Sequence, residues 1–281
     1  MSGLILRKMN FLELDLAIEW AAREGWNPGL HDAGCFYSAD PNGFFIGILN
    51  GEPVGCISAV AYDDNFGFIG FFIVRPDMRG HSVGLELGHV ATAYLGKRNI
   101  GLDGVENKVK NYQSYGFKPA YKNIRFKGVA KAAPPVRGIV KASTLPLSEI
   151  CVYDRNFFPA HRERFLSEWL RQPGATALAA LSAQEKLCGY GLVRPCREGF
   201  KIGPLFAEDL DTARRLLASL SSCLPHGASF FLDIPSVNAD AELLVSEYKM
   251  SPVFRTMRMY SQAPPDLPLG KIYGITSFEL G

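Results

Sequence analysis

The sequence predicts an α/β protein built from two similar units. Three observations predict it. Strand and helix patterns alternate along the chain, a stretch rich in proline and small residues interrupts them at 128–139, and the order of elements before this stretch recurs after it. Adjacent prolines, here Pro134 and Pro135, do not fit a helix interior or a central strand. We therefore interpret the stretch as a linker between units 1–130 and 140–281.

The first unit is expected to begin with a helix followed by a hairpin. Apolar residues concentrated over 11–22 predict a mostly buried helix. Two strands are predicted at 43–49 and 53–62. They are joined by Asn50 and Gly51, a pair typical of tight hairpin turns.

A buried strand and an amphipathic helix follow. The strand at 67–74 is apolar, rich in aromatic residues, and ends before Pro76. Apolar residues at helical spacing predict a helix over 82–97. The remaining elements predicted in this unit are a strand at 100–105, a helix at 107–115 and a strand at 117–128.

The second unit repeats the landmarks of the first. A Leu-Asp pair in an apolar strand precedes a helix in both units, and an arginine follows that helix on the next strand. Arg125 stands eight positions after Phe117, and Arg258 stands eight positions after Met250. The Leu-Asp pairs are Leu102-Asp103 and Leu232-Asp233. The matching order of elements predicts a duplication.

Composition narrows the class of function. The 281 residues include 30 Lys or Arg and 28 Asp or Glu, so the formal charge is +2. This balance argues against a nucleic-acid partner, which requires a strongly basic face. No apolar run reaches the ~20 residues of a membrane span, and the N-terminal segment becomes acidic too early for a secretory signal. Six scattered cysteines lack zinc spacing, which predicts reduced thiols, a cytoplasmic location and no metal.

A strand, a short loop and a helix start predict an anion site at 71–84. Gly80 and Gly84 let the backbone approach a ligand closely. The free N–H groups and the dipole of a helix start suit an anion, and Arg79 adds a positive charge. Together these features predict a pyrophosphate cradle. A plain strand-to-helix turn with a surface arginine remains the alternative, because short glycine motifs are common.

This segment resembles the acyl-CoA-binding motif of the GNAT acyltransferase superfamily. The family pattern, Arg/Gln-x-x-Gly-x-Gly/Ala after a strand, is matched over 79–84, with Ser82 where the family has Gly. The resemblance implies that backbone N–H groups and Arg79 bind the pyrophosphate, that the strand edge binds the pantetheine arm, and that the Val74 N–H stabilises the oxyanion. The implied donor-binding residues are Ile73, Val74, Arg79, Gly80, His81, Ser82, Val83 and Gly84.

A second GNAT-like motif lies at 112–117. Tyr112-Gln-Ser-Tyr-Gly-Phe is similar to the family's Tyr-x-x-x-Gly-Phe, in which the tyrosine protonates the departing thiolate. The resemblance therefore implies that Tyr112 is the general acid. The alternative is a core tyrosine, for which Tyr115 is the better candidate because it lies beside the Gly-Phe turn. The family's usual Asn, seven positions before the tyrosine, is Val105 here.

The two motifs together predict an enzyme, an N-acyltransferase that uses acetyl-CoA as its acyl donor. The acceptor is a small-molecule amine or an amino group of a protein. Candidates for the general base are Asp103, Glu106, His31 and Asp32. Asp103 is the foremost, because desolvation in an apolar strand raises the pKa of a carboxyl. Asp233 stands at the same place in the second unit, which is not expected to bind acyl-CoA. This parallel favours a structural role for both aspartates.

The second unit is expected to lack an acyl-CoA site. Its corresponding segment carries three carboxylates and no glycine loop, and these would repel a pyrophosphate. The carboxylates are Glu208, Asp209 and Asp211. This unit is then a scaffold or a wall of the acceptor pocket, and the loop at 26–32 is a further candidate for that pocket. The competing hypothesis is a non-catalytic module that binds acyl-CoA or a partner. A strand-like segment at 271–278 is predicted to pair with one of the two sheets.

Overall fold

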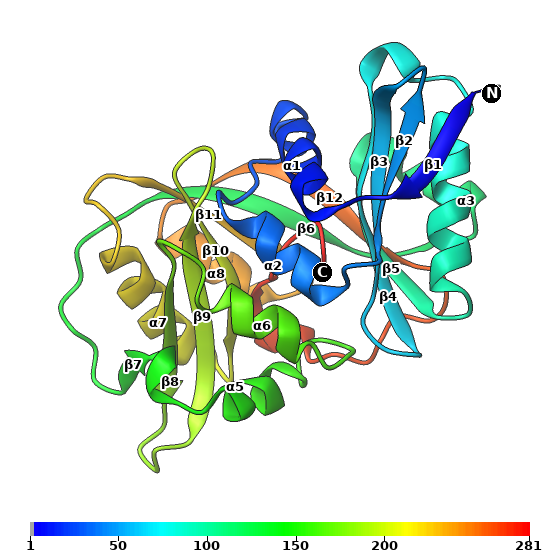
Figure 1. The fold of residues 1–281 in the computed structure, drawn as a ribbon. Coiled ribbons are helices and arrows are strands. Elements are labelled where there is room, and N and C mark those ends of the chain that lie inside the picture. The colour runs from blue at the N-terminus through cyan, green and yellow to red at the C-terminus, as the bar shows by residue number, and fades with distance from the viewer. Residues whose placement is uncertain (1–2) are drawn as a thin grey trace.

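The computed structural model describes residues 3–281, and its elements alternate as predicted (Figure 1). The strands are β1 (Leu4–Lys8), β2 (Phe44–Leu49), β3 (Glu52–Ala61), β4 (Phe66–Val74), β5 (Asn99–Val105), β6 (Lys118–Val129), β7 (Ile139–Lys141), β8 (Thr176–Leu181), β9 (Leu187–Pro195), β10 (Phe200–Ala207), β11 (Ser229–Pro235), β12 (Ser251–Tyr260) and β13 (Ile272–Gly274). The α-helices are α1 (Leu14–Arg23), α2 (Asp32–Ala39), α3 (Val83–Leu95), α4 (Val109–Ser114), α5 (Leu147–Asp154), α6 (Glu163–Trp169), α7 (Leu210–Ser222) and α8 (Ala239–Glu247).

The strands of both halves form one continuous mixed sheet. Their order is β1-β2-β3-β4-β5-β12-β6-β11-β10-β9-β8-β7, and β13 pairs with β10. The two halves exchange strands at the centre: β12, from the second half, pairs with β5, whereas β6, from the first half, pairs with β11. β12 and β6 also pair with each other. The predicted pair of twisted sheets is therefore joined, and neither half completes its sheet alone.

A bulge separates β4 from β5 in the first half. The two strands pair in parallel only where Phe66–Ile69 meets Asn99–Leu102. Beyond this point the β3–β4 register shifts, and Phe71 has a positive φ of 45°. Such a bulge bends its strand and re-aims the side chains around it. β4 and β5 consequently diverge and leave an opening between them.

The corresponding opening in the second half is filled by the chain itself. β10 and β11 pair in parallel only where Phe200–Ile202 meets Phe230–Leu232. β13 then lies against β10, pairing Gly274 with Leu205. The strand-like segment at 271–278 thus joins the second half of the sheet. Beyond β13 the chain returns to the first half, where residue 279 lies against β4.

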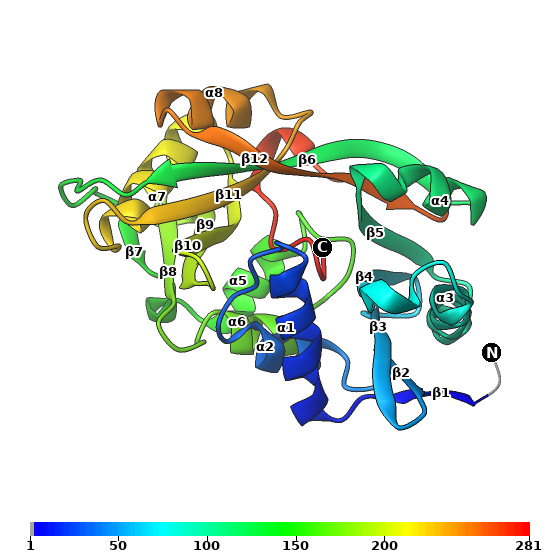
Figure 2. The same cartoon turned by 90° about the horizontal axis from the view of Figure 1, so that it is seen from above.

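The core extends across both halves. The sheet has two arms, one formed by β1–β5 and the other by β7–β10. α1, α2, α5 and α6 lie between these arms (Figure 2). One large buried cluster combines side chains from both arms, among them Phe36, Phe71, Trp169 and Leu192. α3 covers the outer face of the first arm, and α7 covers that of the second. Within residues 3–281, no helix is both long and apolar enough to cross a bilayer.

Candidate active site

A cleft of about 1260 Å³ occupies the opening between β4 and β5. Residues of β4, the loop at 78–81, α3 and α4 line it from the first half. The second half contributes the start of β12, from 252 to 256, and the pair Phe278 and Glu279. The cleft therefore lies where the two halves meet, a common place for ligand sites.

The predicted pyrophosphate loop borders this cleft. Arg79, Gly80, His81 and Gly84 line it. Gly80 has a φ of 85°, which glycine adopts without strain. No side chain caps the start of α3, so the backbone N–H groups of its first turn remain available to an anion.

The other predicted donor-binding residues differ in how they are placed. The Val83 side chain is buried beneath α3, and Ser82 stands at the helix N-cap; neither side chain lines the cleft, so each would act through its backbone. Ile73 and Val74 line it from β4, beyond the point where β5 is paired. The Val74 carbonyl accepts a hydrogen bond of 3.0 Å from Arg79 Nε.

Arg79 also forms an ion pair with Glu24, the residue that follows α1 and also lines the cleft. The two bonds hold the guanidinium beside the loop. They use some of the guanidinium N–H groups that could otherwise donate to a phosphate.

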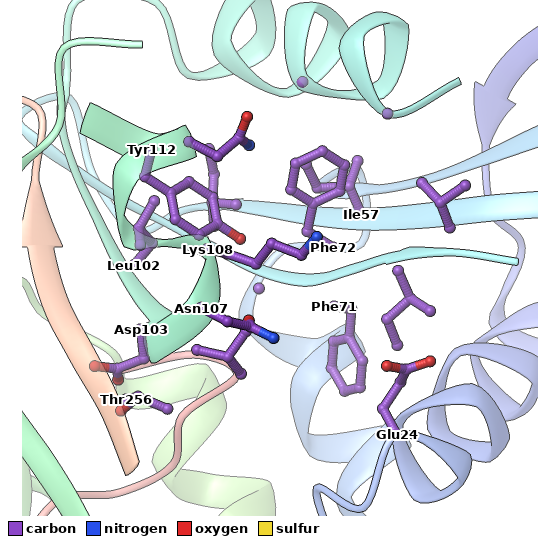
Figure 3. Close-up of a pocket in the computed structure, with 18 of the residues that line it drawn as sticks. Glu24, Ile57, Phe71, Phe72, Leu102, Asp103, Asn107, Lys108, Tyr112 and Thr256 are labelled. Atoms are coloured by element: carbon purple, nitrogen blue, oxygen red, sulfur yellow. The ribbon is translucent and has the colours of Figure 1, made fainter. Parts of the chain in front are cut away.

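Tyr112 stands on α4 and faces β4 across the cleft. Its ring packs against Phe117, with ring centroids 6.3 Å apart, and Figure 3 shows its hydroxyl pointing toward the space that Lys108 and Phe72 also enter. Burial raises the pKa of Tyr112 to about 12, so the phenol stays protonated at neutral pH. The core alternative for Tyr115 was wrong, since this side chain is 55% exposed.

Asp103 lines the cleft, but its carboxylate is fully buried in an ion pair with Arg258. Arg258 of β12 donates hydrogen bonds of 2.9 and 2.7 Å to its two oxygens, and Asn123 donates a third of 2.8 Å. In Figure 3 the carboxylate points away from Phe71. This geometry favours the structural alternative for Asp103 over the role of general base.

The remaining base candidates are dispersed. Asp32 is buried in an ion pair with Arg194, 2.7 Å away. His31 is exposed and does not line the cleft, whereas Glu106 lines it and pairs with Lys122 at 3.2 Å. Of the candidate loop at 26–32, only Trp26 lines the cleft.

No sequence motif predicted that Glu279 would lie at the cleft, where it lines the wall with its carboxylate oxygens buried. Glu279 is 2% exposed, and neither of its carboxylate oxygens has a hydrogen-bond partner among residues 3–281. The available signal was a single acidic residue within the otherwise uncharged run from 272 to 281. Within the same residues, no three His, Cys, Asp or Glu side chains gather in a way that would hold a metal ion.

The second half has no equivalent loop. Asp209 caps α7 by accepting a hydrogen bond of 2.7 Å from the Thr212 N–H, so the helix start is satisfied internally. Glu208 is bound by Tyr153 and by Lys271. β13 fills the adjacent opening between strands. The described part of this half therefore has neither an uncapped helix start nor an open gap in which acyl-CoA could bind.

Comparison with known families agrees with this architecture. Residues 12–117 match the acetyltransferase (GNAT) family, and residues 150–274 match an acetyltransferase (GNAT) domain. The two matches together cover most of the chain. The chain belongs to the GNAT family and carries two GNAT domains in tandem, as its motifs predicted. The boundaries 1–130 and 140–281 stay predictions.

Individual relatives resemble the whole chain. A curated relative, Holothin acyltransferase from Pseudoalteromonas sp. (strain SANK 73390), is 29% identical over 96% of this chain and 92% of its own length. GNAT proteins generally transfer an acyl group from acyl-CoA to an amine, so these matches support acyltransferase activity.

Solved structures share the fold. A putative acetyltransferase from Pyrococcus horikoshii is 23% identical, with a TM-score of 0.86 over 100% of this chain and 97% of that one. A tandem GNAT protein from the clavulanic acid biosynthesis pathway is 14% identical, with a TM-score of 0.65 over 94% and 99% of the two chains. The tandem arrangement is therefore shared with a protein of little sequence similarity.

Proposed function

We propose that the protein is an acetyl-CoA-dependent N-acyltransferase with one active site, in the cleft between β4 and β5. A single observation carries the proposal: an uncapped helix start and a protonated tyrosine lie on two sides of one opening beside a strand bulge. The family match and the relative named as an acyltransferase support acyl transfer as the activity.

The residues of the first half suit the acyl donor. The backbone N–H groups at 80–84 would bind the pyrophosphate, because they lie at the positive end of the α3 dipole. Arg79 would add charge-assisted hydrogen bonds. The free edge of β4 at Ile73 and Val74 would pair with the pantetheine amides, which leads the thioester toward the bulge.

Tyr112 would protonate the departing thiolate. A phenol with a pKa of about 12 is fully protonated at neutral pH, so it is ready to donate. The backbone N–H of Val74 would stabilise the oxyanion, and one such donor contributes roughly 3–4 kcal/mol in acyl transfer. The acceptor would enter from the side that the second half lines.

Two measurements test the proposal together. Thermal unfolding with acetyl-CoA, free CoA and ADP reports binding, since a ligand at 100 times its dissociation constant adds about 2.7 kcal/mol to stability. Release of free thiol from acetyl-CoA in the presence of amines then reports transfer. Stabilisation by CoA species without any amine-dependent thiol release would favour the non-catalytic binding module instead. No stabilisation by any of the three compounds would overturn the donor site.

A further inference from the structure

We propose that Lys108 is an acylation site of the protein itself, and that its side-chain nitrogen receives the acyl group from a donor bound in the same chain. This inference rests on the proposed function, since it names an amine that the cleft between β4 and β5 already contains. It assigns a role to a cleft lysine that neither GNAT-like motif includes.

Lys108 lies on the same helical face as Tyr112. It ends a short 3-10 helix (Glu106–Lys108) directly before α4, on which Tyr112 stands four positions later. Side chains four positions apart in a helix lie on one face. Both residues line the cleft, as does Val74 on β4, and Figure 3 shows Lys108 extending from the Tyr112 side of the cleft toward Phe72. The amine therefore enters the space in which the thioester and the proposed general acid would meet.

The nitrogen of Lys108 has no ion-pair partner in the described part of the chain. Three lysines form ion pairs among residues 3–281, and Lys108 is not one of them. Glu106, two positions earlier, is paired with Lys122 instead, at 3.2 Å. Lys108 is exposed, so water can take the proton that its ammonium must lose before the nitrogen attacks. The amine is thus free to move within the cleft and to act as a nucleophile.

Proximity favours transfer to this amine over transfer to other lysines of the surface. A lysine has a flexible four-carbon stem, so its nitrogen can sample the cleft around its Cα. Two groups held in one site react as if each were present at a far higher concentration than in solution. Lys110 provides the contrast, because it is exposed on α4 but does not line the cleft. We therefore expect acylation at Lys108 and not at Lys110.

The transfer balances without a further reactant. The Lys108 ammonium gives one proton to water, and its nitrogen forms a bond to the acyl carbon. The carbon–sulfur bond breaks, and Tyr112 protonates the leaving thiolate. The proton that the nitrogen loses as the amide forms restores Tyr112 through water. Each transfer leaves an amide on the chain and a free thiol in solution, and it removes a positive charge from the cleft. The amide nitrogen is no longer a nucleophile, so the reaction should stop after one acyl group per chain.

The experiment incubates the full chain with acetyl-CoA in the absence of any added amine. Chromatography measures the free CoA released, and mass spectrometry after cleavage at glutamate locates the acetyl groups. For wild type we expect release of about one CoA per chain, with Lys108 acetylated at least tenfold faster than Lys110. Lys108→Arg should release no CoA above the level found without protein, while it binds acetyl-CoA as tightly as wild type in calorimetry. Lys110→Arg is the matched control on α4 and should behave as wild type.

Two changes of condition show whether the transfer occurs within one chain. Tenfold dilution of the protein at saturating acetyl-CoA should leave the rate per chain unchanged, because donor and amine belong to one molecule. An excess of free CoA should slow acetylation of Lys108 and leave that of Lys110 as it was, because only the first depends on the donor site.

Every other result overturns a stated claim. Equal acetylation of Lys108 and Lys110 would show an uncatalysed reaction, and a rate per chain that rises with protein concentration would show transfer between chains. Either result overturns the assignment of Lys108. A wild-type protein that binds acetyl-CoA but leaves Lys108 unmodified contradicts this inference and leaves the donor site intact. A wild-type protein that does not bind acetyl-CoA contradicts the proposed function itself.

Discussion

Arg125, from the first half of the chain, donates two hydrogen bonds of 2.7 Å to Asp233, from the second. Both side chains are 2% exposed. Arg258 and Asp103 form the same contact in the opposite direction, with the arginine from the second half. Each pair joins an exchanged strand to its neighbour in the other half. The two ion pairs therefore fasten the halves to each other.

Breaking one of these ion pairs is expected to destabilise the whole chain. Arg125→Met leaves Asp233 buried without its partner, a change that costs roughly 3–5 kcal/mol. The double variant Arg125→Met/Asp233→Leu should recover most of the loss, because neither charge of this pair is left without the other. Urea unfolding of the three proteins measures both effects.

A surface ion pair provides the control for this cycle. Arg214→Met removes an ion pair with Glu247 on the surface between α7 and α8, and exposed pairs contribute little. We expect a much smaller change in the free energy of unfolding than for Arg125→Met. Equal effects of the two substitutions would mean that the buried pair does not hold the halves together.

The repeat was predictable from the sequence, whereas the exchange of strands was not. Equal spacing placed Arg125 and Arg258 at matching positions, and the structure shows that each pairs with an aspartate of the repeat. A repeat does not say which copy supplies the neighbour of a strand, because β6 and β12 carry similar patterns. Only packing in three dimensions selects the partner, so the single joined sheet was beyond the sequence.

The candidate site was predictable where a motif was present. The loop at 79–84 and Tyr112 both border the cleft, as their motifs imply, although their roles stay predictions. Asp103 looked unusual in an apolar strand, but its charge partner comes from the other half of the chain. Glu279 lies far from both motifs in the sequence. It reaches the cleft only because the segment after β13 crosses from one half to the other.

Substitution of Tyr112 by Phe separates catalysis from binding. The variant removes the proton donor but keeps the ring that packs on Phe117, so turnover is expected to fall about 10²-fold or more. Acetyl-CoA affinity, measured by calorimetry, should change little. Tyr248→Phe is the matched control, because this tyrosine does not line the cleft. A Tyr112→Phe protein with full turnover would exclude the phenol as the general acid.

Calorimetry should find one acetyl-CoA per chain. Among residues 3–281, only the first half combines an uncapped helix start with an open gap between strands, since Asp209 and β13 occupy the equivalent places in the second. Gly84→Asp introduces a carboxylate into the first turn of α3, where it suits the helix dipole but repels phosphate. We expect this variant to stay folded and to bind acetyl-CoA at least tenfold more weakly. Two equivalents bound by wild type would contradict the assignment.

Lys201 is expected to make stability depend on pH. Its side chain is buried, and burial lowers its pKa to about 8 from the ordinary 10.5. The folded protein loses this proton near pH 8, whereas the unfolded chain keeps it to about pH 10.5. Between these values the unfolded state holds more protons, so the contribution of Lys201 to stability rises with pH. The full rise is about 3 kcal/mol.

The test compares the free energy of unfolding of wild type with that of Lys201→Met. Urea unfolding measures both at pH values from 7 to 10. Cysteines and tyrosines of the unfolded chain also titrate in this range, but they are common to both proteins and cancel in the difference. Cys196 is the exception, because burial raises the pKa of its thiol and the charge of Lys201 opposes that rise, so both proteins carry Cys196→Ala. The stability of Lys201→Met relative to wild type should be greatest at pH 7, because wild type then holds a buried ammonium. This difference in stability should shrink as the pH rises. A difference that does not vary with pH would show that Lys201 keeps an ordinary pKa.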